Sequence, residues 1–170
     1  MADRSYSESA LVQFSERLTN SAAFGTLFRE GMDLVEETAA YLDGDGRTEA
    51  KALERSVSLT YATESMRLTT RLMQLASWLL LHRAVKEGEM TLTQANREKT
   101  KVKLSAADPG TDEMLGKLPE QLKDLIARSM VLQSKVRRLD TTIHAPTTER
   151  MAIGNPLVPQ LNRLKAAFER

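Results

Sequence analysis

Apolar side chains recur every three or four residues along most of the chain, which is the spacing of one face of an α-helix. The first clear run predicts a helix over residues 21–42. The segment Asp43-Gly44-Asp45-Gly46 is expected to end this helix, because glycine readily adopts the left-handed conformation that caps many helices. The apolar stripe of the predicted helix consists of Phe24, Leu27, Phe28, Met32, Val35, Ala39 and Leu42.

Residues 48–87 contain neither proline nor glycine, and their pattern predicts one unbroken helix of about 40 residues. The stretch from Trp78 to Leu81 is apolar on every side, so it needs neighbours all round. A domain of this size is not expected to supply them all, and we therefore expect a second chain. The residues predicted to pack in the bundle or the dimer are Tyr61, Met66, Leu68, Leu72, Met73, Trp78, Leu80 and Leu81. Small side chains that would let another helix approach closely are Thr63, Thr70, Ser77 and Ala84.

Shorter elements follow. Gly88 is expected to end the long helix, and Thr91 with Gln94 forms a capping-box pattern that starts a short basic helix. Residues 105–116 predict a loop, and Pro119 stands at the expected first turn of a third long helix that reaches about Ala145. The stripe of that helix consists of Leu118, Leu122, Leu125, Ile126, Ser129, Leu132, Val136, Leu139 and Ile143.

The C-terminal segment, residues 146–170, combines three prolines with a short amphipathic pattern. Its apolar residues at steps of four, three and four predict a small helix and are Leu157, Leu161, Leu164 and Phe168. Two interpretations stay open: the segment folds back on its own bundle, or it enters a groove on another protein. The flanking prolines favour the second interpretation.

These elements predict an all-α fold class: an elongated three-helix bundle with a short extra helix and a flexible C-terminal tail, assembled as a homodimer. Residues 1–20 are expected to form a loose segment with a short helix. Residues 21–145 are expected to form the helical bundle domain, and residues 146–170 the flexible tail with its short amphipathic helix.

The composition limits the cell compartments and the classes of partner that we expect. The 170 residues suit a single domain, and the absence of cysteine excludes disulfides, thiolate nucleophiles and cysteine metal sites. A net charge of +1 provides no long-range field for nucleic acid or anionic lipid. The N-terminus lacks the pattern of a signal peptide, and no stretch is apolar enough to span a bilayer. We therefore expect a cytoplasmic protein that binds neither membrane nor nucleic acid.

No motif for catalysis stands out. A Gly-rich phosphate loop, a Gly-x-Ser-x-Gly motif and a His-Glu-x-x-His motif are all missing, so we expect no enzyme activity, no metal and no cofactor. Asp43, Asp45 and Glu54 match a calcium-loop template that fails at its next positions, Arg47 and Thr48. His82 is a candidate phospho-accepting histidine on a helical bundle, against the simpler interpretation of a histidine at the edge of the helix.

Charged residues suggest one structural cluster. Glu64, Arg67 and Arg71 share one predicted helix, and two arginines four residues apart repel each other. An acidic partner on the first helix would compensate, so we predict an interhelical ion-pair cluster of Glu36, Glu37, Glu64, Arg67 and Arg71. The basic runs at residues 97–103 and 135–138 lack interleaved aromatic residues and are expected to be solvated faces.

Two long stretches resemble one known family. They are AAFGTLFREGMDLVEETAAYLDGDGR, at residues 22–47, and YATESMRLTTRLMQLASWLLLHRAVKEGEMT, at residues 61–91. Both resemble the RcdA family, the regulators of CtrA degradation of alphaproteobacteria, and the similarity extends over roughly residues 23–104.

The resemblance implies a homodimeric three-helix bundle without enzymatic activity. Members of the family act as adaptors for the ClpXP protease, which consists of ClpX and ClpP. They bind this protease after a CpdR-type response regulator has primed it. They hold cargo such as cell-cycle transcription factors, and they take up a further PopA-type adaptor. From the residues alone, a histidine phosphotransfer module using His82 and a purely structural dimeric module remain the alternatives.

Overall fold

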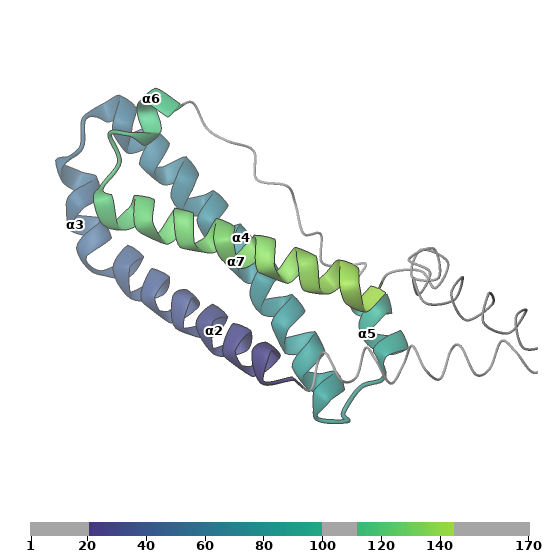
Figure 1. Ribbon diagram of the computed structural model, residues 1–170. Helices are drawn as coiled ribbons and strands as arrows, with labels where there is room; N and C mark the ends of the chain where they lie inside the picture. The colour runs from purple at the N-terminus through teal and green to yellow at the C-terminus, as the bar shows by residue number, and fades with distance from the viewer. Residues whose placement is uncertain (1–20, 100–111, 145–170) are drawn as a thin grey trace, which may run out of the picture.

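The computed structural model describes residues 21–99 and 112–144. Within these ranges the chain forms helices and no strand (Figure 1). The predicted all-α fold class is therefore confirmed. The predicted N-terminal helix lies outside the described residues, as does the C-terminal segment with Leu157, Leu161, Leu164 and Phe168. The helices are α2 (Ala22–Asp43), α3 (Asp45–Ala52), α4 (Arg55–Lys86), α5 (Leu92–Lys99), α6 (Asp112–Leu115) and α7 (Glu120–His144).

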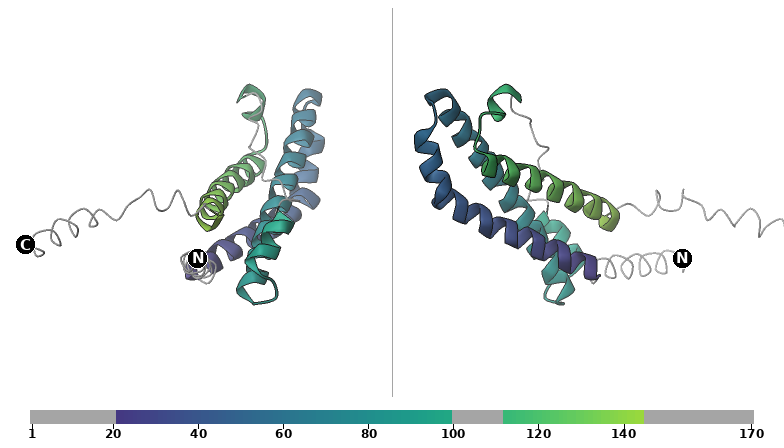
Figure 2. Two further views of the ribbon diagram at one scale, coloured as in Figure 1. Left: turned by 90° about the vertical axis from the view of Figure 1, so that its right-hand side faces the viewer. Right: turned by 60° about the vertical axis from the view of Figure 1, so that its left-hand side comes forward.

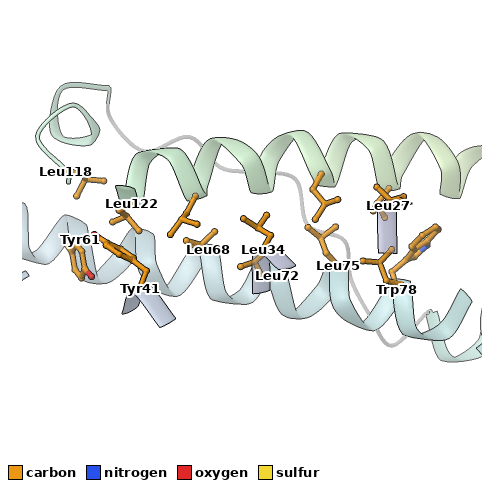
Figure 3. Packing of buried hydrophobic residues seen from close by; sticks show 14 of the residues in the cluster. Leu27, Leu34, Tyr41, Tyr61, Leu68, Leu72, Leu75, Trp78, Leu118 and Leu122 are labelled. Atoms are coloured by element: carbon orange, nitrogen blue, oxygen red, sulfur yellow. The ribbon is translucent and has the colours of Figure 1, made fainter. Parts of the chain in front are cut away.

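The three long helices α2, α4 and α7 all pack against one another. The chain runs along α2, turns through α3, and returns antiparallel along α4, while α7 lies across one face of that pair (Figures 1 and 2). The core fills the space between the three helices, with Leu34, Leu72 and Leu122 among its members (Figure 3). The predicted stripe of the third helix is confirmed, because Leu118, Leu122, Leu125, Ser129, Leu132, Val136 and Ile143 are all buried.

Helix α2 begins and ends where the sequence predicts. Ser21 caps its first turn, since the hydroxyl accepts a hydrogen bond from the Phe24 amide at 3.3 Å. The amide of Gly44 closes the helix by donating to the carbonyl oxygens of Ala40 and Tyr41. The expected left-handed cap is wrong, however, because Gly44 has φ −109°. Among the described residues the left-handed conformation occurs at Gly88, with φ 76°.

The predicted single helix over residues 48–87 is wrong, because the chain breaks at Leu53 and Glu54 into α3 and α4. Leu53 has an extended backbone, with φ −76° and ψ 148°. No proline or glycine causes the break. Instead α3 packs back onto the bundle: the Tyr41 hydroxyl donates to Glu49 at 2.6 Å, and Gly46 is buried against Tyr41 and Tyr61. A straight helix would have carried these contacts away from the core.

One stripe of α4 is buried, and it includes Tyr61, Leu68 and Leu72 from the residues predicted to pack. The end of α4 that carries Trp78 is also covered by the same chain. Trp78 is 1% exposed and Leu79 is fully buried, so the expectation that Trp78 needs a second chain is wrong. The ring of Phe24 on α2 lies 6.4 Å from the Trp78 ring, and Asp140 on α7 accepts from Trp78 Nε1 at 2.8 Å. Of this stretch, Leu80 stays exposed and Leu81 is half-buried.

His82 lies in the core and does not reach solvent. Its ring stacks on Trp78 with 3.9 Å between the ring centroids, and Nδ1 donates to the Trp78 carbonyl oxygen at 2.9 Å. A phospho-accepting histidine must be accessible to a partner protein, so the phosphotransfer hypothesis for His82 is wrong. The simpler interpretation is right that His82 lies near the end of α4, but the side chain is fully buried and does not lie at the edge of the core. Burial lowers the pKa of His82, which the nearby carboxylate of Asp140 only partly offsets.

Helix α5 closes the end of the bundle beside Trp78. The predicted capping box is confirmed: the Thr91 amide donates to the Gln94 side chain at 2.9 Å, and the Gln94 amide donates to the Thr91 hydroxyl at 3.2 Å. Lys99 at the other end of α5 pairs with Asp140 of α7 at 2.7 Å.

The predicted loop over residues 105–116 is wrong in part, because residues 112–115 form the short helix α6 against α4.

Replacing Gly46 by alanine tests the packing of α3. A Cβ atom there would lie 2.6 Å from Tyr61 Oη and 2.8 Å from the Tyr41 carbonyl oxygen. We expect Gly46→Ala to lower the free energy of unfolding by about 1–3 kcal/mol, measured by urea denaturation. Gly25→Ala in α2 is the control, because nothing lies within 4 Å of the added atom. The control should raise the free energy of unfolding by up to about 1 kcal/mol, and equal unfolding midpoints for the two variants would contradict this packing.

The buried histidine predicts a loss of stability in mild acid. In the unfolded chain His82 takes up a proton as the pH falls below its ordinary pKa of 6.5, whereas the buried ring resists protonation. Unfolding is therefore favoured by up to about 1.4 kcal/mol for each further pH unit. His82→Asn keeps a side-chain N–H donor but does not titrate, so the difference in unfolding free energy between wild type and variant should shrink as the pH is lowered. His144→Asn, which retains His82, should not remove this dependence. A difference that stays constant from about pH 7.5 to 5.5 would contradict the prediction.

Candidate interaction surface

A row of large apolar side chains runs along the solvent side of α4. Leu59, Met66, Met73 and Leu80 stand seven residues apart and are 72%, 72%, 66% and 52% exposed. Residues at this spacing lie almost in one line on a helix, drifting by only about 20° per step. We call these four residues the α4 outer row. Single exposed apolar side chains are ordinary, but a contiguous line of them is typical of an interaction surface.

Small side chains border the α4 outer row. Thr63 and Thr70 are exposed, and Ser77 and Ala84 are half-buried. The hydroxyls of Thr63 and Ser77 donate to the carbonyl oxygens of Leu59 and Met73, at 3.0 and 2.8 Å. These hydroxyls therefore already have partners, and their small size leaves room for another helix to approach closely.

A groove of about 270 Å³ lies between α2 and α4, next to the α4 outer row. Met73 belongs to both, because its side chain forms one edge of the groove. We call this feature the α2–α4 groove. Its apolar lining comprises Val35, Ala39, Leu42, Leu72, Met73 and Ala76.

Two threonines add hydroxyls to the α2–α4 groove. The Thr69 hydroxyl donates to the Ser65 carbonyl oxygen at 2.8 Å. The Thr38 hydroxyl is buried and has no hydrogen-bond partner within the described part of the chain. The hydroxyl oxygen therefore lies beneath the apolar surface of the groove, where a buried polar group without a partner is destabilising.

The residues predicted to pack in the bundle or the dimer fall into two groups. Tyr61, Leu68 and Trp78 are buried in the core of their own chain and are not available to a second one, while the buried Leu72 also lines the α2–α4 groove. Met66, Met73 and Leu80 belong to the α4 outer row, and Leu81 is half-buried. Only the exposed group can contribute to an interface.

The predicted ion-pair cluster is wrong in its interhelical part. Glu64 and Arg67 pair within α4 at 2.7 Å, as their spacing suggests. Glu37, however, pairs with Arg128 of α7 at 2.7 Å rather than with the arginines of α4. The hydrogen bond between the two lowers the pKa of Glu37 and raises the pKa of Arg128. Glu36 is exposed on α2.

Arg71 has a structural role in the core. It is 7% exposed and donates to the Ser129 hydroxyl of α7 at 2.8 Å. Burial lowers the pKa of Arg71, while the carboxylate of Glu64 acts in the opposite direction.

The predicted solvated face at residues 135–138 includes an interhelical contact, because Lys135 pairs with Glu30 of α2 at 2.8 Å. Helices α2 and α7 are therefore joined by ion pairs on the side away from the α2–α4 groove.

Sequence analysis missed two parts of this surface. Leu59 was not singled out, although its seven-residue distance from Met66 was a usable signal. Thr38 gave no signal, because only the structure shows that its hydroxyl is buried without a partner. In the described residues, no three histidine or acidic side chains are grouped to hold a metal ion. No helix within residues 21–99 and 112–144 is both long and apolar enough to cross a bilayer.

Comparisons with known proteins identify the family of this chain. The model of a family described as a protein of unknown function (DUF1465) matches residues 15–168. The crystal structure of RcdA from Caulobacter crescentus CB15 is similar with a TM-score of 0.64 and 48% sequence identity. The match covers 77% of this chain and 98% of that one. No curated protein matches. The identity and the coverage together show that the chain belongs to the RcdA family.

Proposed function

We propose that this protein is a non-enzymatic adaptor that binds a primed ClpXP protease and tethers cargo proteins, such as cell-cycle regulators, for degradation. The 48% identity to RcdA over most of the chain supports an adaptor role. The observation that carries the proposal beyond this likeness is the α4 outer row, an apolar surface that the described residues of its own chain leave in water. The proposed partners are ClpX and ClpP with a CpdR-type response regulator, a PopA-type adaptor and protein cargo, in the cytoplasm.

The α4 outer row is the proposed dimer contact. Covering one such apolar side chain contributes about 1.5–3 kcal/mol, so four of them from each of two chains can drive association. The small residues beside the row allow two helices to approach closely. A dimer would present every other binding surface twice, which raises the effective concentration of cargo near the protease. The chain would thus accelerate degradation without making or breaking a bond.

The C-terminal segment is the proposed contact to a partner. Its apolar residues Leu157, Leu161, Leu164 and Phe168 lie outside the described residues. Their spacing is that of a helix that enters an apolar groove with one face. A flexible tether lets such a helix search for a partner while it stays attached to the bundle.

Charges in the α4 outer row should separate the dimer. We expect Met66→Asp with Met73→Asp to weaken dimerisation by about 100-fold or more, since two apolar contacts are lost and two carboxylates lose water. Both side chains are exposed in the single chain, so the thermal unfolding midpoint should change little. Val131→Asp is the control, because Val131 is 55% exposed on α7, away from the row. Sedimentation velocity over a concentration series measures the dissociation constant. A monomeric wild type, or a double variant as dimeric as the control, would contradict the proposed interface.

Reconstituted degradation tests the adaptor role. With purified ClpXP, a CpdR-type regulator and a cell-cycle cargo, we expect the wild-type chain to shorten the half-life of the cargo. Leu161→Asp with Leu164→Asp should reduce this acceleration of degradation about tenfold, because charges on the apolar stripe prevent docking. Asn162→Asp with Ala166→Asp introduces the same number of carboxylates off the stripe and should retain it.

The outcomes of the degradation assay are distinct. An unchanged half-life with the wild-type chain would overturn the adaptor proposal and leave a purely structural dimeric module. Full acceleration by the Leu161→Asp, Leu164→Asp variant would overturn the tail contact alone.

A further inference from the structure

The α2–α4 groove is an open apolar site that the described part of the chain does not fill. Helix α7 packs against both α2 and α4 and occupies one side of that pair (Figure 2). The groove on the pair therefore resembles the position of a missing fourth helix of a bundle. Its walls end at the exposed side chain of Met73, so an occupant would continue onto the α4 outer row.

Thr38 lies in the wall of the α2–α4 groove with its hydroxyl oxygen buried, so the surface that the groove offers to an occupant is almost entirely apolar. Threonines of α4, such as Thr63 and Thr69, donate their hydroxyl hydrogen to the carbonyl oxygen four residues before them. Thr38 makes no such bond although it is only 3% exposed. An amphipathic helix that turns its apolar face inward therefore suits this groove.

The C-terminal segment has the composition that this site requires. Its stripe from Leu157 to Phe168 would be about 17 Å long as a helix. The exposed apolar surface from Met66 to Leu80 is about 21 Å long, so the two lengths agree.

The connection is long enough to reach. Asp140, near the end of α7, lies beside Trp78 of α4, with 2.8 Å between Oδ1 and Nε1. Trp78 is five residues, or about 8 Å of helix rise, from Met73 at the groove. Residues 145–156 span up to about 40 Å when extended, so they can bring residue 157 to the groove without strain.

The charges are complementary. Glu36 and Asp43 directly follow the groove residues Val35 and Leu42, and both are exposed. The segment carries Arg163, Lys165 and Arg170 off its apolar stripe. Exposed ion pairs add little affinity, but they favour one orientation of a docked helix over the other.

We propose that in the monomeric chain the C-terminal segment, residues 157–168, docks as a helix into the α2–α4 groove, with Leu161 and Leu164 beside Met73, and that dimerisation through the α4 outer row displaces it. Tethering favours this occupant, because a linker of this length gives an effective concentration of the order of millimolar, above that of a second copy in dilute solution. A partner that captures the segment would then uncover the groove. The proposal concerns the isolated chain and does not depend on the protease.

Disulfide trapping tests the proposal directly, because the natural sequence contains no cysteine. The full-length chain carries Met73→Cys together with either Leu161→Cys or Leu164→Cys. A matched control carries Val131→Cys with the same tail cysteine, since Val131 is exposed on the outer side of α7. Each variant is oxidised in dilute solution, and the products are identified by non-reducing electrophoresis and mass spectrometry.

We expect at least one Met73 pair to form an intramolecular disulfide about tenfold faster than its Val131 control, as a docked segment requires. Equal rates for the Met73 and Val131 pairs would overturn the proposal. Disulfides that join only two chains would place the segment in the groove of a second copy and would overturn docking in the same chain. Rapid dimerisation of the single variant Met73→Cys would show that the α4 outer row of a second copy covers the site instead. Failure of the degradation assay would leave all of these outcomes unaffected.

Discussion

The packing of α4 between α2 and α7 is the interaction on which the rest of the structure depends. The buried stripe of α4 faces these two helices, and at its aromatic end Trp78 contacts both of them through Phe24 and Asp140. Two neighbouring long helices cannot surround α4, so part of its circumference stays in water. The α4 outer row and the α2–α4 groove are the uncovered remainder, so the surface available for partners follows from the number of helices in the bundle.

Buried polar groups fix how the three helices align. Apolar contacts alone would tolerate a shift of one helix along another, because leucines are similar in shape and lack direction. The hydrogen bonds from Trp78 to Asp140 and from Arg71 to Ser129 each need one register between α4 and α7. Lys99 adds α5 to the same site through its ion pair with Asp140. Removing the acceptor Asp140 would leave the N–H of the buried Trp78 without this partner, which is more destabilising than the bond is stabilising.

An adaptor requires a stable body and surfaces that exchange partners. Core residues such as Leu68 and Leu79 are fully buried in one chain, so the bundle does not need a second copy to cover its centre. The apolar surface left in water is the part that gains free energy from association. The proposed tethering of cargo requires such a separation between a stable core and an exposed binding surface.

The sequence by itself determined the helical fold class, the buried stripe of α7, the capping box at Thr91 and the family, because these depend on local periodicity and on extended similarity. Tertiary structure decided the break at Leu53, the burial of His82 and the pairing of Glu37 with Arg128. Periodicity shows that a side chain is on one face, but not which neighbour it meets. Only the packed helices separate Leu72, which is buried, from Met73, which remains in water, since burial depends on how many neighbours surround a helix and not on its own sequence.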